Sequence, residues 1–542
     1  MQNRKTFRKT VFVTTARAAV AALLSAACLT GCARGPRLLD SAERKVIDRS
    51  IVEYPNDLAL TPYVGGLTAP VGIAFESQDG AYKDALLLAE GGKTPRVYGF
   101  KPDGEQFWIY PKTTQIPFFG DPFRLHGPIG GIALHKGLIY VSHRDETGMG
   151  VITVFDYDGK HSTVVADLPA RGDYGVTDLA VHPTNGRLYF GVGAATNSGV
   201  VGLDNWDAGW VENYPDFADR PLTNLKLNGY RFTTPNPRGG LFGGDDIAVT
   251  APLQAFGDSR QLRIPASPVS KPSAAVYSVN LEGGDLRVEA HGIRLARGLV
   301  FNEFGNLFVT NNGMELRGTR PVKDDPDVVL RVPLGGQIWY GWPDFSTDLS
   351  AISESRFQPP QQMIVRTGYP ELASVLDHES SGLIAPDRNT LLRAVFAPLS
   401  GAAKMTFVPD NAASGFKPFA GSLVVTLYGD RAPFATSGHA MTGPQGYSVK
   451  RVDLDTKRVT DFVFNTRQLP AHLIKDKDRV SMERPIDAKF GPDGALYIVD
   501  YGYMELRNGE ERVQSKTGRI YRLGPIPAPT TKPAPVEYLT GE

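Results

Sequence analysis

Residues 484–500 read RPIDAKFGPDGALYIVD, and this stretch decides the fold of the chain. The apolar segment Ile486–Phe490 leads into the turn pair Asp493-Gly494, and a second segment of aromatic and β-branched residues then runs to Asp500. Asp-Gly pairs tolerate the positive φ that tight turns need, and β-branched and aromatic residues favour strands. The stretch therefore predicts two strands joined by a tight turn.

The same cassette recurs along the chain, with a further strand after each pair. The predicted second strands are Ala85–Glu90, Gly137–His143, Gly186–Gly193, Gly305–Asn311, Gly421–Leu427 and Gly494–Asp500. Repeats of three or more strands, without amphipathic helices between them, favour radial blades over a parallel α/β sheet. We therefore expect an all-β chain folded as a six-bladed β-propeller.

The repeats are unevenly spaced, which predicts long loop insertions in the third-to-fourth and fourth-to-fifth cassettes. One runs from Thr196 to Ser273 and the other from Asp344 to Ser400. Long loops in compact folds commonly carry function, so we expect the ligand site beside them. The propeller is predicted to span residues 51–524, with Val52–Val64 supplying the strand that closes the last blade.

The first 32 residues have the features of an export signal. A basic start precedes the apolar run Ala18–Leu29, which ends in Leu29-Thr30-Gly31-Cys32. This ending resembles the bacterial lipoprotein cleavage box, which predicts lipidation of Cys32 and anchoring to the bacterial envelope; Ala33 after the cysteine favours the outer membrane, facing the periplasm. Residues 33–50 are predicted to be a polar tether and residues 525–542 a disordered tail rich in Pro and Thr.

Charge and cysteine content exclude some functions. Lys plus Arg and Asp plus Glu both number 58, so no overall field favours nucleic acid. The two cysteines are Cys28 and Cys32, so signal cleavage would leave no disulfide in the folded chain. Because no Cys-x-x-Cys-His motif is present, a c-type haem is excluded, and any electrons must leave to a separate acceptor.

Several motifs, in this order and spacing, resemble the glucose/sorbosone dehydrogenase family over roughly Leu67 to Leu523. They are Gly292–Phe301, Gly305–Gly313, Arg317–Pro321, Trp339–Asp344, Arg484–Asp487, Gly491–Gly494 and Thr517–Tyr521. The resemblance implies a six-bladed propeller that holds pyrroloquinoline quinone over its channel together with a calcium ion. It also implies oxidation of an aldose or sorbosone-type sugar by hydride transfer to the quinone.

Site residues follow from the same resemblance. Arg294 corresponds to an arginine near the quinone, while Lys404 and Arg431 fall near the positions that bind its carboxylates. The segment Asn312, Gly313 and Met314 falls where backbone carbonyls ligate calcium. These residues form the predicted cofactor and metal site.

The predicted catalytic residues are Asp173, Tyr174, His126 and Arg294. Asp173-Tyr174 stands where related enzymes have Asp-His, the His acting as general base, whereas a Tyr hydroxyl is ordinarily protonated at neutral pH. Asp173, Asp178 or His126 are alternatives for this role.

Two other functions remain open on the sequence. A metal-dependent sugar lactonase would need carboxylates that converge on the channel mouth, for which the candidates are Asp173, Asp178, Glu315 and Asp487. A non-catalytic binding or scaffold lipoprotein would explain Tyr174 as a lost base.

Overall fold

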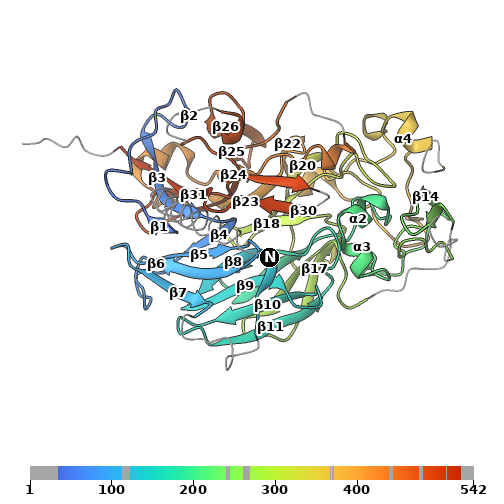
Figure 1. The fold of residues 1–542 in the computed structure, drawn as a ribbon, viewed down its shortest axis with the longest axis horizontal. Coiled ribbons are helices and arrows are strands. Elements are labelled where there is room, and N and C mark those ends of the chain that lie inside the picture. The colour runs from blue at the N-terminus through green and yellow to red at the C-terminus, as the bar shows by residue number, and fades with distance from the viewer. Residues whose placement is uncertain are drawn as a thin grey trace, which may run out of the picture.

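The chain is described by a computed structural model, which covers residues 35–526 except 113–122, 240–244, 261–268, 366, 367, 369, 370, 439–442, 475–479, 508 and 509. Six sheets of four or five strands are grouped around a common centre (Figure 1). The predicted signal, Cys32 and nearly all of the predicted tail lie outside the described residues.

Each sheet runs from an inner strand to an outer one. The first three are β4 (Pro70–Phe75), β5 (Leu86–Glu90), β6 (Arg96–Phe100), β7 (Gln106–Tyr110); β8 (His126–His135), β9 (Leu138–Arg144), β10 (Gly150–Phe155), β11 (His161–Leu168); and β12 (Val176–Val181), β13 (Arg187–Val192), β16 (Ala275–Asn280), β17 (Arg287–His291), β21 (Ile338–Trp339). The last three are β18 (Ala296–Phe301), β19 (Leu307–Asn311), β20 (Pro326–Val332), β22 (Leu392–Pro398); β23 (Ala402–Phe407), β24 (Leu423–Leu427), β25 (Ser448–Asp453), β26 (Arg458–Asn465), β2 (Val52–Glu53); and β27 (Pro485–Phe490), β28 (Leu496–Asp500), β31 (Gly518–Pro525), β3 (Leu58–Leu67), β1 (Arg37–Leu38).

The inner strands form a closed ring. Each contacts the inner strand of the next blade, and β27 of the sixth blade contacts β4 of the first. The chain is therefore a six-bladed β-propeller, which confirms the predicted fold. The ring closes through β3, which pairs with β31 so that Leu60 lies opposite Leu523. The segment predicted as a tether packs on this seam, because β1 pairs with β3 and Ile47 is buried.

The hydrophobic core lies between neighbouring blades. The second and third blades enclose a cluster that includes Ile152, Leu179 and Phe190, and Phe190 stacks on Tyr277. Because both faces of a blade are covered, strands such as Arg187–Val192 are buried along their whole length. No helix of the described residues is long and apolar enough to cross a membrane.

Every inner strand carries a bulge near its first residue, at the same end of the channel. In β18, for example, Ala296 pairs with Asn311 but Leu299 pairs with Val309, so one extra residue stands in the inner strand. Four other inner strands carry one extra residue between their first pairs, and β8 has a longer irregularity there, between His126 and Gly131. A β-bulge turns a side chain out of the ladder and is common next to functional sites.

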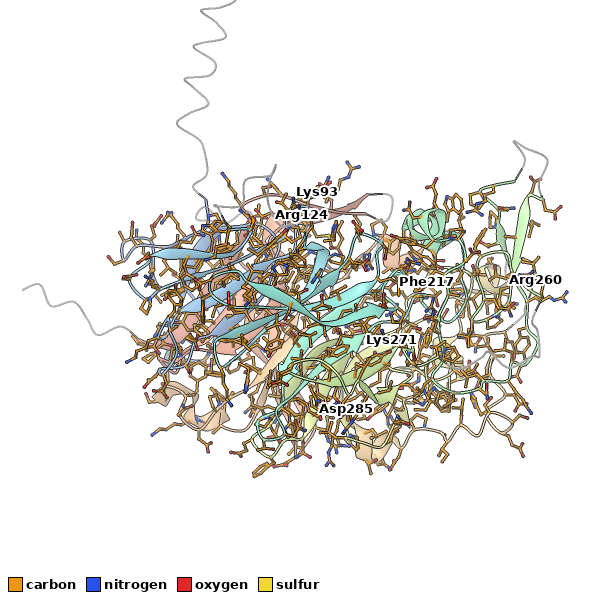
Figure 2. The ribbon with its side chains drawn as sticks, turned by 90° about the horizontal axis from the view of Figure 1, so that it is seen from below. Lys93, Arg124, Phe217, Arg260, Lys271 and Asp285 are labelled. Carbon is orange, nitrogen blue, oxygen red and sulfur yellow. The ribbon has the colours of Figure 1, made fainter. Side chains whose placement is uncertain are left out.

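Both predicted insertions exist and lie together on one side of the ring (Figure 1). The first, between β13 and β16, contains α2 (Leu203–Asp207), α3 (Trp210–Asn213), β14 (Phe232–Pro235) and β15 (Ile247–Thr250). The second, between β20 and β22, contains β21, a 3-10 turn at Ser355–Phe357, α4 (Gln361–Val365) and α5 (Arg388–Leu391). The two are joined where Asn228 N donates to the Val375 carbonyl at 2.9 Å. Figure 2 shows Arg260, in the first insertion, far from Lys93 on the ring.

Four smaller elements complete the description. They are the hairpin β29 (Met504–Arg507) and β30 (Glu510–Val513), which precedes β31, and the 3-10 turns Ser414–Phe419, Phe434–Thr436 and Ala471–Leu473.

Candidate functional site

A cavity of about 1280 Å³ occupies the mouth of the central channel, at the end where the inner strands begin. All six blades contribute to its wall, and residues of the bulges are part of it: Val71, Gly130, Thr177, Arg297, Lys404 and Ile486. The first insertion adds Ala208 and Trp210, so the cavity does lie beside an insertion as expected. Its size suits a cofactor or small ligand.

The lining is rich in charge, with seven Lys and Arg residues against five Asp and Glu residues. Four of the cations stand on the fourth and fifth blades, and three of them, Arg297, Lys404 and Arg431, have donors without a hydrogen-bond partner among the described residues. Arg297 lies over the Tyr428 ring, 4.4 Å from its centroid, and has no hydrogen bond to any described residue. Burial lowers the pKa of Arg297, so its charge is costly in the folded chain without a partner.

Lys404 and Arg431 also have unused donors. The Lys404 side chain is 3% exposed, and its Nζ lies 3.1 Å from Asp178 Oδ1 without hydrogen-bond geometry. Arg431 Nε is buried without a partner, although Arg431 Nη2 lies 3.6 Å from Glu511 Oε1. Desolvation opposes the charge of Arg431, but Glu511 and Glu315 outweigh it and raise its pKa. These buried N–H groups are suited to an anionic ligand.

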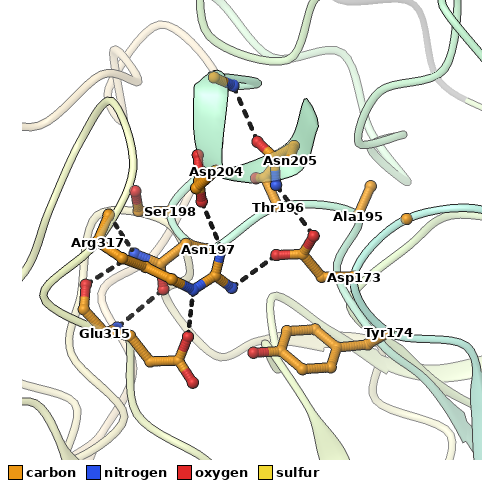
Figure 3. A network of polar contacts seen from close by, with 12 residues as sticks. Asp173, Tyr174, Ala195, Thr196, Asn197, Ser198, Asp204, Asn205, Glu315 and Arg317 are labelled. Atoms are coloured by element: carbon orange, nitrogen blue, oxygen red, sulfur yellow. Dashed lines mark hydrogen bonds and ion pairs between the residues drawn. The ribbon is translucent and has the colours of Figure 1, made fainter. Parts of the chain in front are cut away.

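Arg317 is the centre of a buried ion-pair network on the insertion side of the cavity (Figure 3). Its Nη2 donates to Asp173 Oδ2 at 2.6 Å, its Nε to Glu315, and its Nη1 to Asp204 of α2. Asp173 Oδ1 also accepts from Asn205 Nδ2 at 3.0 Å and from Trp210 Nε1 at 2.8 Å. Both carboxylate oxygens of the predicted base Asp173 therefore already accept hydrogen bonds. Through Asn205 and Trp210 these bonds hold α2 and α3 against the ring.

Burial and neighbouring charges separate the pKa values of these carboxyl groups. Burial and the nearby Asp173 raise the pKa of Asp204 to about 6, although Arg317 opposes the rise. Burial would also raise the pKa of Glu315. Three neighbouring arginines outweigh this effect and lower the pKa to about 2; they are Arg317, Arg294 and Arg431. Glu315 is thus held as a carboxylate.

Tyr174 lines the cavity, whereas Arg294 lies behind it. Arg294 is 1% exposed and donates to Tyr174 Oη at 2.7 Å, to Asn197 Oδ1 at 2.9 Å and to the Asn197 carbonyl at 2.9 Å. Arg294 is not part of the cavity wall, so it positions Tyr174 and the Asn197 loop. Because the Tyr174 oxygen accepts from Arg294, the hydroxyl proton remains available for donation to a ligand.

The segment predicted to bind calcium does not fit a divalent cation at the Asn312 carbonyl. Arg294 Nη1 donates to that oxygen at 3.2 Å, which places a positive charge where a second one would be repelled. The Gly313 amide donates to Asp327, and the Met314 amide to Asp325. The described residues contain no group of three or more His, Cys, Asp or Glu side chains that could hold a metal.

Of the other predicted residues, Asp173, Asn312, Gly313, Lys404 and Arg431 reach the cavity wall, while His126 and Met314 do not. His126 begins β8 opposite Arg144, next to the lining residue Gly127.

Sequence reasoning does not single out four cavity residues, which are Arg144, Arg297, Arg317 and Glu511. Arg297 and Arg317 lie inside the family-like motifs, which is the available signal for them. Arg144 and Glu511 lie outside the family-like motifs, so the sequence gives no signal for them.

No family model matches the chain, and neither does any curated protein sequence. Among solved structures it is similar to the PQQ domain of pyranose dehydrogenase from Coprinopsis cinerea, with 15% identity, coverage of 88% of this chain and 98% of that chain, and a TM-score of 0.49. It is also similar to a family AA12 carbohydrate-active enzyme from Trichoderma reesei, with 14% identity, coverage of 90% and 100%, and a TM-score of 0.48. A putative oxidoreductase (glucose dehydrogenase) from Thermus thermophilus gives 16% identity, coverage of 86% and 99%, and a TM-score of 0.40.

These solved structures include the kind of protein that the sequence motifs resemble. Because their identities to this chain are 16% or lower and their TM-scores are below 0.5, the roles of residues here rest on the chain's own geometry.

Proposed function

We propose that the cavity binds a polycarboxylate quinone of the pyrroloquinoline quinone class and that the chain oxidises a sugar with it. The observation that carries this proposal is a set of donors without hydrogen-bond partners among the described residues, on Arg297, Lys404 and Arg431, which come from adjacent blades and line the cavity. Carboxylates form short and strong bonds with such cations. The ligand's negative charge would also offset the cost of burying them.

Bound here, the quinone would supply the redox chemistry by accepting a hydride from the sugar carbon. The hydroxyl on that carbon must lose a proton as its C–O bond becomes C=O. Glu511 is the lining carboxylate without a short contact, because its polar side-chain contacts with the described residues are Arg431 at 3.6 Å and Tyr501 Oη at 3.5 Å. We assign proton acceptance to Glu511 and hydrogen-bond donation toward the ligand to Tyr174. No step is assigned to a metal ion.

Reconstitution tests this proposal. Purified protein is titrated with pyrroloquinoline quinone, with and without calcium, and reduction of an artificial dye is followed with a panel of aldoses. Saturable binding followed by sugar-dependent dye reduction is the expected result. Quinone binding without turnover on any sugar would favour a non-catalytic binding protein, and no binding at micromolar quinone would refute the proposal.

The lactonase alternative finds no support in the carboxylates named for it. Asp173 and Glu315 both bind Arg317, Asp178 faces Lys404, and Asp487 lies 3.7 Å from Lys489 Nζ. Each of these carboxylates already has a cationic neighbour, whereas water activation needs several that converge on a metal.

The setting of the reaction stays a prediction from the sequence. We propose export and lipidation at Cys32, attachment to the outer membrane facing the periplasm, and a separate electron acceptor. Cys32 lies outside the described residues, so the support is the sequence pattern Leu29–Cys32.

A further inference from the structure

Arg144 provides a second place for an anion in the same cavity. It is the last residue of β9 in the second blade, and it lines the cavity. Its Nη2 donates to the Gly172 carbonyl at 3.1 Å, which is the one hydrogen bond of the side chain to the described residues, and its Nε is buried without a partner. No carboxylate of the described residues forms an ion pair with it. Burial lowers the pKa of Arg144, so its charge is costly in the folded chain without an anionic partner.

Arg144 is separate from the cations assigned to the quinone. In a closed ring of six blades, the second blade stands opposite the fifth, which carries Lys404 and Arg431. Lys93, an exposed cation on the first blade, also lines the cavity and has no ion pair among the described residues. The loop that holds Lys93 packs on the second blade, since a Cβ built on Gly127 would lie 3.3 Å from Gly91 O and 3.5 Å from Gly92 O. Arg144 and Lys93 therefore form a second cationic wall.

Two aromatic side chains of the cavity wall are held by the loop that Arg144 contacts through the Gly172 carbonyl. A Cβ built on Gly175 would lie 3.4 Å from Arg144 Nε, so the guanidinium extends along the loop that holds Tyr174. Trp210 of α3 also lines the cavity and is held to the same loop, because its Nε1 donates to Asp173 at 2.8 Å. Aromatic rings provide flat, partly polar surfaces for a sugar, and a guanidinium matches a carboxylate with two parallel bonds.

We propose that the cavity takes a carboxylated sugar, such as a hexuronate, whose carboxylate binds Arg144 while its ring lies against Tyr174 and Trp210. The proposal rests on the proposed function, in which Arg297, Lys404 and Arg431 bind the quinone and Arg144 remains available for the substrate. It narrows the substrate from sugars in general to acidic sugars.

Binding to the full chain without quinone tests the inference directly. Calorimetric titrations compare D-galacturonate and D-glucuronate with D-galactose and D-glucose. At least one uronate is expected to bind about tenfold or more tightly than its neutral counterpart, which corresponds to about 1.4 kcal/mol. Arg144→Gln should remove that preference and leave the affinity for the neutral sugar and for the quinone unchanged. Arg144→Lys keeps the charge without the planar fork and should retain part of the preference.

The matched control is Arg260→Gln, because Arg260 is an exposed arginine of the first insertion outside the cavity wall. It should bind all ligands as the unaltered chain does. Equal affinity for uronates and neutral sugars would overturn the inference. So would a loss of quinone affinity in Arg144→Gln, because Arg144 would then be a cofactor ligand. A uronate preference that survives in a chain unable to bind quinone would support this inference while refuting the proposed function.

Discussion

Arg317 Nη2 lies 2.6 Å from Asp173 Oδ2, and this bond joins the third blade to a loop of the fourth. Both side chains are at least 95% buried, and Arg317 also binds Glu315 and Asp204. Removing one member of a buried ion pair leaves an uncompensated charge. Asp173, Glu315 and Arg317 line the cavity, so the same ion pairs that stabilise the fold also shape the proposed site.

Arg317→Met should lower the free energy of unfolding by about 3–5 kcal/mol, because three buried carboxylates lose their common partner. Urea unfolding followed by tryptophan fluorescence measures this change. The control is Arg287→Met, which removes an exposed pair with Asp285 and should cost less than about 1 kcal/mol. Similar losses in the two variants would contradict the structural role of the network.

Glu315 should give the fold a specific dependence on acid. Its pKa falls from an ordinary 4.5 to about 2, because the surrounding arginines outweigh the effect of burial. The folded-state pKa is lower than that of the unfolded chain, so Glu315 stabilises the fold above about pH 4.5 and loses this contribution as the pH falls toward 2. The contribution is on the order of 3 kcal/mol. Unfolding midpoints measured from pH 6 to pH 2 should fall less steeply in Glu315→Gln, whereas the exposed Glu303→Gln should follow the unaltered chain.

Arg297→Gln should separate quinone binding from stability. It removes charged donors from the proposed cofactor wall, so quinone affinity should fall roughly 10- to 100-fold. The unfolding midpoint should stay the same or rise, because burial disfavours the Arg297 charge in the empty cavity. Fluorescence titration with quinone, together with thermal unfolding, measures both effects. Unchanged affinity would remove Arg297 from the cofactor site.

Glu511→Gln should impair turnover rather than binding. If Glu511 accepts the sugar proton, kcat should fall by about 10²- to 10⁴-fold while quinone affinity changes little. Steady-state dye reduction and quinone titration on the same preparation provide the two readouts. The exposed Glu303→Gln serves again as the control. Full activity in Glu511→Gln would assign the proton to another group.

Cys32→Ser should prevent lipid attachment. In cells fed radiolabelled palmitate, the unaltered chain is expected to carry label and to sediment with membranes, whereas the variant is expected to be unlabelled and released. Cys28→Ser, four residues earlier, is the matched control and should behave as the unaltered chain. Label that persists in Cys32→Ser would exclude this residue as the attachment point.

The sequence predicts the blades because strands covered on both faces, such as Arg187–Val192, are apolar runs with turn residues at their ends. It does not reveal the bulges, since one extra residue leaves the apolar pattern nearly unchanged. The sequence therefore points to Arg294 rather than Arg297, although the bulge in β18 places Arg297 in the cavity wall and Arg294 behind Tyr174.

Other parts of the site could not be predicted from local patterns. Arg144 ends an ordinary strand, and its importance comes from the lack of an acidic partner around it among the described residues. Asp173 is predicted as a possible base, but its partners Asn205, Trp210 and Arg317 stand 32, 37 and 144 residues away in the chain. Residues so far apart in the sequence meet only when the blades and the insertion have packed together, so local sequence patterns do not predict these contacts.

The pairing of Leu60 in β3 with Leu523 in β31 joins a strand from the start of the propeller to the last strand of the chain, and this pairing completes the sixth blade. Five blades can assemble in order during synthesis, but the sixth stays open until β31 has emerged. Until then β3 keeps an unpaired strand edge and one side of the core faces solvent, so the unfinished ring is open to aggregation through that edge.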